Sequence, residues 1–299
     1  MQFSKTLLPA YHKDEALLAD IRSNQSNFEG FRLWWLGQSG FLLQFEGKHL
    51  LFDPYLSDSL TKKYAATDKP HTRISELVID PARLDFLDVV TSSHNHTDHL
   101  DAETLLPIFA KNPGIQFVFP EANREFITER LNGGSDLQVG ERLGWIGLTD
   151  GQTAEAAGFK FYGVPAAHNA LERDARGRCK FMGFVAEFKD HTGHTYRVYH
   201  SGDTLWYEGM VEILKPFHLD VALLPINGSR PERRVAGNLS AEEAARLGKE
   251  IEAKLVIPHH YDLFEFNTED PAEFVRWADE YETSFRVLKL GGKAEVFKE

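Results

Sequence analysis

The residues of this 299-residue chain best suited to chemistry form one short run, His94-Asn95-His96-Thr97-Asp98-His99. The run follows apolar residues 86–92, which predict a buried strand. In an extended chain, residues two apart point the same way, so His94 and His96 could bind one cation. A turn at Thr97 would direct Asp98 and His99 to a neighbouring position for a second cation. Imidazole and carboxylate groups suit Zn²⁺, and also Mn²⁺ or Fe.

Three later segments end a predicted strand with side chains of the same kinds. His168 follows 159–164, Asp203 follows 196–201, and His260 follows 255–257. A carboxylate offers two oxygens, so Asp203 could bridge two cations. The candidate ligands that we expect to converge at these strand ends, a set that suits two divalent ions, are His94, His96, Asp98, His99, His168, Asp203 and His260.

The surrounding sequence predicts an α/β scaffold with two sheets between helices. Short aromatic runs at 33–36, 41–45 and 50–52, separated by glycines and Asp-Pro, predict consecutive antiparallel strands. Further strands are predicted at 86–92, 116–119, 159–164, 181–188, 196–201, 221–224, 255–257, 285–289 and 294–297. Helices are predicted at 13–24, 102–110, 120–131, 240–251 and 271–281, and 56–84 should be a long loop or a loop with a short helix. We expect one domain, 1–299, with residues 1–30 as an N-terminal helical extension.

Two helix starts carry specific capping signals. Ser240 with Glu243 forms a capping-box pattern, and Asp270 before Pro271 is typical of a helix N-cap followed by proline at the first helical position. These signals fix where the helices of the second half should begin.

Composition limits the classes of partner. The formal net charge is −12, which argues against a nucleic-acid ligand, and the short cluster of Arg230, Arg233 and Arg234 is either a solvated loop or an anion clamp. The sequence shows no signal-peptide pattern and no apolar stretch of membrane-spanning length, so we expect a cytoplasmic protein with no integral membrane segment. Cys179, the one cysteine, is interpreted as a packing or surface residue rather than a nucleophile.

These motifs resemble the metallo-β-lactamase superfamily. The resemblance rests on the run His94–His99, the turn Ser201-Gly202-Asp203-Thr204 and the late Pro258-His259-His260, and it covers most of the chain from about Trp34 onward. Within the superfamily, Trp34-Trp35-Leu36-Gly37 and Tyr199-His200-Ser201-Gly202-Asp203 look similar to the ascorbate-6-phosphate lactonase branch. His168 departs from that branch, whose pattern has no histidine there, and so favours a general dinuclear hydrolase.

The resemblance implies an αββα sandwich with the site at one edge of the two sheets. It implies one ion on His94, His96 and His168, a second on Asp98, His99 and His260, and Asp203 between them. It also implies that Asp53 orients a ligand, while the alternative for Asp53, which precedes Pro54, is a simple turn-forming role. His200 and His259 are interpreted as buried supporting residues, since His259 should point away from its neighbour His260 in a strand.

The function expected from this site is metal-dependent hydrolysis. Two cations, Zn²⁺ before Mn²⁺ or Fe, would make a bridging hydroxide available near neutral pH. That hydroxide would attack a small ester or lactone, with or without a phosphate group, and Asp98 would pass a proton to the leaving group. The alternatives are a phosphodiesterase similar to phospholipase D, and a metal-binding protein without catalysis.

The substrate is expected to be a small molecule, and a homo-oligomer is left open. Positions beside the site-bearing strands are the candidates for contacting the substrate, although a simple loop role is the alternative for each. These positions are Asn227, Arg230, Tyr261 and Asp262.

Overall fold

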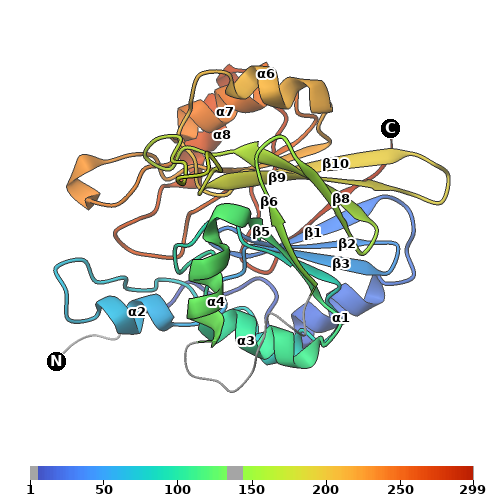
Figure 1. Cartoon of the computed structure of the whole chain (residues 1–299), viewed down its shortest axis with the longest axis horizontal. Coiled ribbons are helices and arrows are strands. Elements are labelled where there is room, and N and C mark those ends of the chain that lie inside the picture. Colours follow the sequence, from blue (N-terminus) through green and yellow to red (C-terminus); the bar gives the residue numbers. More distant parts are fainter. Residues whose placement is uncertain (1–5, 133–143, 299) are drawn as a thin grey trace.

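The structure, a computed structural model of the chain, describes residues 6–132 and 144–298. Two mixed sheets lie face to face in it, with helices on their outer faces (Figure 1). In spatial order, the strands of the first sheet are β13 (Lys293–Val296), β1 (Phe31–Gly37), β2 (Gly40–Phe45), β3 (Lys48–Phe52), β4 (Val89–Thr91), β5 (Gln116–Pro120) and β6 (Gly144–Leu148). Those of the second are β12 (Val256–His259), β11 (Val221–Pro225), β10 (Thr195–His200), β9 (Met182–Lys189), β8 (Phe159–Pro165) and β7 (Thr153–Ala156).

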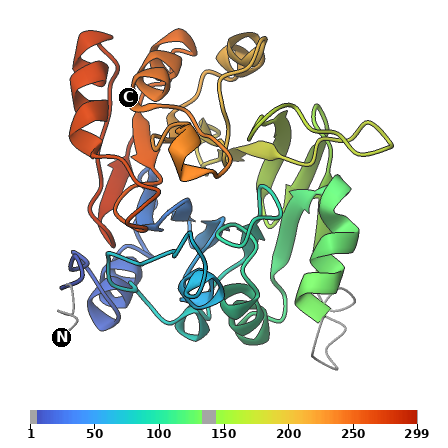
Figure 2. The ribbon, with the colours of Figure 1, turned by 90° about the vertical axis from the view of Figure 1, so that its left-hand side faces the viewer.

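The helices are divided between the two outer faces. Next to the first sheet are α1 (Glu15–Ser23), α2 (Ser59–Tyr64), α3 (Ala102–Lys111) and α4 (Arg124–Asn132), and next to the second are α6 (Met210–Leu214), α7 (Ala241–Glu250) and α8 (Pro271–Glu280). Short 3₁₀ turns are η1 (Pro81–Arg83), η2 (Glu121–Asn123), η3 (Lys215–Phe217) and η4 (Pro231–Arg233). Figure 2 shows the same layers from the side, and the expected αββα sandwich is confirmed.

The aromatic runs near the start of the chain form the antiparallel part of the first sheet. β1 pairs with β2 and β2 with β3, with Trp34 opposite Leu42 and Leu42 opposite Leu51. Every residue of β1 and β2 is buried, on both faces, because one face meets the second sheet and the other meets helices. One continuous apolar cluster includes residues of both sheets, which supports the one-domain interpretation; that interpretation stays a prediction.

Both capping signals are confirmed. The Ser240 side chain accepts a hydrogen bond from the Glu243 amide, and the Glu243 carboxylate accepts one from the Ser240 amide, so α7 begins with a complete capping box. The Asp270 side chain accepts from the amide of Ala272 at the start of α8. These caps satisfy amide groups that have no partner within the helix.

Some expected elements differ from the structure. Residues 285–289 are not a strand: Phe285 forms one isolated bridge with Val256, and the next residues pack on the core without a strand partner. Alternating apolar residues indicate that a segment is buried, and a buried segment need not pair with a neighbouring strand. Strands β6 and β7 and helix α6 were not expected from the sequence, because β7 consists of alanine, threonine and glutamate and α6 is only five residues long. Across the described residues, no helix has the length and apolarity needed to cross a membrane.

Candidate metal centre

Strand direction brings three of the expected ligands to one edge of the second sheet. β8 and β10 are both antiparallel to β9, so they run in the same direction, and β11 and β12 run parallel to β10. The carboxyl ends of β8, β10 and β12 therefore meet at one edge, a usual place for ligand sites in such sheets. His168, Asp203 and His260 follow directly after these three ends.

The histidine-rich run reaches the same edge from β4 of the first sheet. Gly202, with φ of 59°, lies so close to Ser93 that a Cβ atom there would be 2.5 Å from the Ser93 side chain. The Met182 amide also donates to the Ser93 carbonyl over 3.1 Å. A residue without a side chain is therefore required where the ends of β4 and β10 meet.

The first group of candidate ligands comprises His94, His96 and His168, whose ligand atoms lie within 4.8 Å of one another. The grouping matches the expectation, but the local geometry does not. Residues 93–99 form bends and turns rather than an extended chain, and the His99 amide donates to the His96 carbonyl over 3.1 Å. Bends at residues 93–96, not strand alternation, bring the centroids of the His94 and His96 rings to 4.6 Å from each other, and the turn that follows carries Asp98 and His99.

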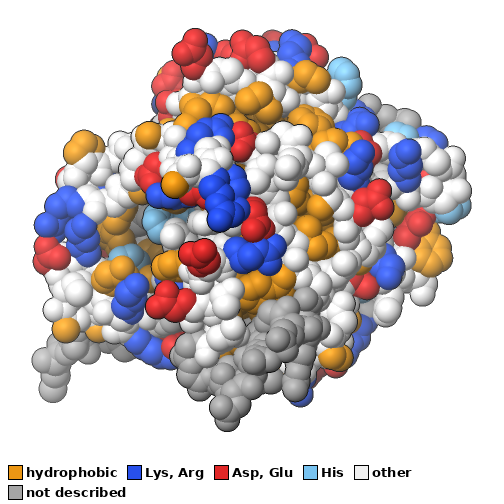
Figure 3. All heavy atoms as spheres, viewed as in Figure 1, with side chains coloured by type: hydrophobic (Ala, Val, Ile, Leu, Met, Phe, Trp, Pro, Cys, Tyr) orange, Lys and Arg blue, Asp and Glu red, His pale blue; other side chains and the backbone are white. Residues whose placement is uncertain are grey.

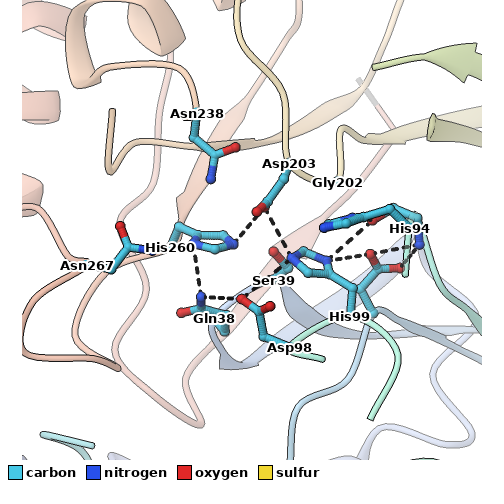
Figure 4. A network of polar contacts seen from close by, with 12 residues as sticks. Gln38, Ser39, His94, Asp98, His99, Gly202, Asp203, Asn238, His260 and Asn267 are labelled. Atoms are coloured by element: carbon cyan, nitrogen blue, oxygen red, sulfur yellow. Dashed lines mark hydrogen bonds and ion pairs between the residues drawn. The ribbon is translucent and has the colours of Figure 1, made fainter. Parts of the chain in front are cut away.

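The second group comprises Asp98, His99, Asp203 and His260, again within 4.8 Å of one another. Asp203 Oδ1 is 2.7 Å from His260 Nε2 and 3.2 Å from His99 Nε2 (Figure 4). Asp203 Oδ2 is 3.4 Å from His168 Nε2, which belongs to the first group. Asp203 thus contacts both groups, as a bridging carboxylate would.

The polar atoms at the centre of the cluster fit bound cations. The Nε2 atoms of His94, His99 and His260 and the Oδ1 atom of Asp203 are buried. Although the last three lie close together, none of the four atoms forms a hydrogen bond of acceptable geometry among the described residues. Buried polar atoms without partners are costly, so a cluster of them needs an explanation. Lone pairs of imidazole nitrogen and carboxylate oxygen facing one another are the donors that divalent transition-metal ions bind.

In two of the histidine rings, the hydrogen bond made by Nδ1 determines that Nε2 can bind a cation. Nδ1 of His99 is 2.8 Å from Asp53 Oδ2, and Nδ1 of His168 is 2.8 Å from the Gly237 carbonyl. Both partners only accept hydrogen bonds, so Nδ1 carries the proton in each ring. Nε2 of a neutral ring is then left with a lone pair for a cation.

The ionisation states of the buried groups also suit cation binding. Burial lowers the pKa of His168 to about 4 and that of His94 well below its usual value, so both rings are neutral at pH 7. Burial alone would raise the pKa of Asp203, but the neighbouring His260 and His99 hold it well below its usual range. Neutral imidazole and ionised carboxylate are the forms that bind metals.

The electrostatic environment of His99 favours a positive charge at this position. Burial lowers its pKa, but Asp203 and Asp98 outweigh that effect and raise the pKa well above the usual value. A divalent cation would meet the same pair of carboxylates.

Gln38 is a site residue that the sequence did not indicate. Its side-chain nitrogen Nε2 is 2.8 Å from Asp98 Oδ2 and 3.0 Å from His260 Nδ1, and its φ is 51°. For His260 Nε2 to bind a cation, Nδ1 must carry the proton. Turning the carboxamide by 180° would present Oε1, which has no partner among the described residues, to that proton, at the cost of the contact with Asp98. Gly37 and Gly40 beside it indicated only a turn.

The three residues expected to support the ligands lie beneath the site. Asp53 is fully buried and accepts hydrogen bonds from the Thr91 hydroxyl and the Ser93 amide as well as the His99 ring. His200 donates from Nε2 to the Ser39 carbonyl over 2.8 Å and accepts at Nδ1 from the Gly202 amide over 3.2 Å. It thereby fixes the turn that carries Asp203.

His259 lies next to His200 and away from the ligand groups. The two rings are parallel, at 1°, with centroids 5.4 Å apart, and His259 Nδ1 is 3.3 Å from Ser39 Oγ. His259 is completely buried and is in neither ligand group. His259 therefore lies outside the ligand groups as expected, but strand alternation is not the reason, because β12 ends at His259 and His260 has a φ of 64°.

A cavity of 580 Å³ opens over the cluster. Four candidate ligands reach its wall: His96, Asp98, His168 and Asp203. Figure 3 shows histidine side chains in a hollow on the left of the molecule, the side that Figure 2 faces. Residues in and near α2 and α4 and the segment 234–236 form much of the rest of the wall. A volume of this order suits a small molecule, in line with typical pockets of about 300–1,000 Å³.

The four residues expected to touch substrate do not line this cavity. Asn227 is fully buried and accepts a hydrogen bond from Asn238, and Tyr261 is 1% exposed, stacked on Trp35, with its hydroxyl donating to the Leu288 carbonyl. Arg230 pairs with Glu269 on the surface. Asp262 is half-buried, and its amide donates to Thr268.

Other side chains line the cavity instead, and of those named next the sequence had singled out Arg234 alone, as part of the arginine cluster. They include Lys63, Lys69, His71, Arg130, Arg234 and Asn267. Of the arginine cluster, only Arg234 reaches the cavity, while Arg233 donates to the carbonyls of Asn227 and Thr268. Cys179 is buried, and burial raises the pKa of its thiol to about 12, in agreement with a packing role.

Known proteins are similar to this chain in sequence. Residues 48–261 match the family model described as the beta-lactamase superfamily domain. A UPF0173 metal-dependent hydrolase of Rubrobacter xylanophilus is 31% identical over 89% of this chain and 97% of its own length, and one of Hyperthermus butylicus is 26% identical over 86% and 94%.

Solved structures agree on the fold. The metallo-beta-lactamase fold protein YhfI of Bacillus subtilis superposes with a TM-score of 0.59 over 89% of this chain and 99% of its own, at 18% identity. At that identity the likeness concerns the fold alone. Since the family model spans most of the chain, and the Rubrobacter relative matches nearly end to end, the chain belongs to the UPF0173 metal-dependent hydrolase family of the metallo-β-lactamase superfamily.

Proposed function

We propose that this metal-dependent hydrolase cleaves a small ester or lactone, in the manner of the lactonase-like branch, at the cluster beneath the cavity. One observation carries the proposal: imidazole nitrogens and a carboxylate oxygen without partners gather at the floor of an open cavity. His94, His96 and His168 would hold one ion, and Asp98, His99 and His260 the other, with Asp203 between them. Zn²⁺ is the first choice, because histidine dominates the donor set.

The protein side chains have distinct roles in this proposal. When bound, two divalent ions would supply hydroxide near neutral pH and polarise the attacked carbonyl. Asp98 lines the cavity; burial raises its pKa, but His99 and His260 outweigh burial and lower it, so the group is a carboxylate at pH 7. It can therefore accept a proton during the attack and return it to the leaving alcohol. With its carboxamide turned to accept the His260 proton, Gln38 would release Asp98.

A phosphodiesterase is the second candidate, because basic side chains line the cavity: Lys63, Lys69, Arg130 and Arg234. Arginine and lysine are the usual partners of phosphate oxygens. A metal-binding protein without catalysis is disfavoured by the cavity itself, since four candidate ligands open onto a space large enough for a small molecule.

A panel of neutral esters, lactones and phosphodiesters, assayed on zinc-loaded protein, tests the proposal. We expect turnover of at least one ester or lactone. We expect both His96→Ala and Asp203→Ala to abolish it with the fold retained, the first with loss of one bound ion and the second with loss of both. His191→Ala is the matched control, since His191 is an exposed histidine paired with Glu46 away from the cluster. Turnover of only the phosphodiester would favour the second candidate, and undiminished turnover in both site variants would contradict the site.

A further inference from the structure

The charged side chains of the cavity are distributed unlike those of the rest of the chain. Acidic residues outnumber basic ones 45 to 33 overall. Six charged residues line the cavity, and the two acids among them are Asp98 and Asp203, both candidate metal ligands. The remaining four are all basic: Lys63, Lys69, Arg130 and Arg234. Once bound cations offset the two carboxylates, every other charged side chain of the cavity wall is cationic.

These four cations come from three separate parts of the fold. Lys63 lies in the last turn of α2, Lys69 lies in the loop after it, Arg130 lies on α4, and Arg234 follows η4. The Lys69 ammonium donates to the Arg234 carbonyl, so the two loops meet at the cavity rim. Figure 3 shows lysine and arginine side chains on more than one side of the hollow that contains histidines. Basic groups therefore surround the space rather than forming a single stripe.

The positive charge at the rim is only partly neutralised by the protein. Lys63, Lys69 and Arg130 each contact uncharged groups of the protein: an aromatic ring or main-chain carbonyls. Lys63 lies over the Tyr64 ring at 5.1 Å, and Arg130 binds two main-chain carbonyls. Arg234 pairs with Asp68 at 2.6 Å, but both side chains are more than half exposed, so the pair is weak and can be exchanged for another anion.

The remaining wall is polar at Asn95, Thr97, Asn169 and Asn267, and it also has an apolar and aromatic part. That part includes Leu60, Tyr64, Phe126, Val235 and Phe264. Tyr64 stacks on His71 with ring centroids 4.3 Å apart, and the two rings together give the wall an aromatic surface. A ligand that fits both features carries an anionic group and a hydrocarbon or aromatic part.

We infer that the substrate of this hydrolase is a small organic anion, with a carboxylate or phosphate group held by Lys63, Lys69 and Arg234 and an apolar part against Tyr64 and Phe264. The inference rests on the proposed function for the reacting bond but concerns the part of the substrate that does not react. Binding energy from such a part orients the scissile bond over the metal cluster.

Calorimetric binding of phenylphosphonate to zinc-loaded protein tests this inference, because the ligand has a dianionic head and an aromatic ring and contains no hydrolysable bond. The cavity variant is Lys63→Gln with Arg234→Gln, which keeps the Arg234 carbonyl that Lys69 binds. The matched control is Lys62→Gln with Arg230→Gln: these neighbours pair with Glu103 and Glu269 and do not line the cavity.

We expect wild type and control to bind phenylphosphonate alike and the cavity variant to bind at least about tenfold more weakly. Benzoate in place of phenylphosphonate distinguishes a carboxylate preference from a phosphate preference, and neutral benzamide should bind much more weakly than either. Equal affinity in the cavity and control variants, tight binding of benzamide, or no anion binding by wild type would overturn the inference. Because no turnover is measured, failure of the ester panel alone would count against the proposed function and not against this site.

Discussion

Nδ1 of His99 donates a hydrogen bond to Asp53 Oδ2 over 2.8 Å, and neither side chain is exposed. Asp53 directly follows β3 with a φ of 37°, and His99 lies in the segment after β4, so the contact joins the chain beyond two neighbouring strands. The carboxylate orients the ring and leaves Nε2 facing Asp203. Such contacts behind a ligand commonly decide how tightly a metal binds.

Asp53→Asn should weaken zinc binding, because the amide replaces a charged acceptor of the His99 proton. We expect a loss on the order of 10–100-fold in affinity, measured by competition with a chromophoric chelator. Asp279→Asn, at an exposed position of α8, is the control and should bind zinc as wild type does. Wild-type affinity in Asp53→Asn would show that this hydrogen bond does not orient a metal ligand.

Gly202→Ala should lose more stability than loss of glycine's backbone freedom explains. The added methyl group would lie 2.5 Å from the Ser93 side chain, where the ends of β4 and β10 meet. Gly209→Ala separates the effects, because Gly209 also has positive φ, 84°, but no atom within 4 Å of an added Cβ. The control should cost about 1–2 kcal/mol of unfolding free energy, and Gly202→Ala clearly more, with loss of bound zinc. Equal costs in denaturant titrations would contradict the crowding argument.

Arg130→Met should loosen the histidine-rich turn. Arg130 donates to the carbonyls of Asn95 and Leu100, on either side of His96, Asp98 and His99. We expect about 1–3 kcal/mol of lost stability for the unpaired carbonyls and a weaker zinc affinity. Arg124→Met on the same helix removes a surface pair with Glu121 and should change neither by a comparable amount. Unchanged zinc affinity in Arg130→Met would argue against a positioning role.

Stability should fall between pH 6.5 and pH 4 in part because of His49, away from the metal cluster. Burial lowers the pKa of His49 to about 4, so the folded state resists a proton that the unfolded chain takes up below about pH 6.5. The stabilisation is full above that pH and declines as pH falls towards 4, with a slope of up to about 1.4 kcal/mol per pH unit. Denaturant titrations of His49→Gln should show a shallower decline, and an identical slope would contradict the assignment to His49.

The sequence predicted which candidate ligands lie together because strand ends and donor types are local properties. The runs before His94, His168, Asp203 and His260 could each be recognised as a strand, and their chemistry matched. Gln38 escaped because its role depends on a turn that only the folded sheet places beside Asp98 and His260.

The cavity wall could not be predicted in the same way. Lys63, Arg130 and Arg234 come from segments that are far apart in sequence and have no common pattern. Asn227 and Tyr261 failed to reach the cavity because proximity in sequence to a site-bearing strand does not determine which way a side chain points. Tyr261 instead packs on Trp35.

The most direct measurement is a calorimetric zinc titration of metal-free protein with matched ligand variants. The account predicts two ions per chain for wild type, one for His168→Ala, which leaves the Asp98, His99 and His260 group intact, and none held tightly by Asp203→Ala. Wild-type protein that binds no zinc, or Asp203→Ala protein that still binds two ions as tightly as wild type, would contradict the proposed centre.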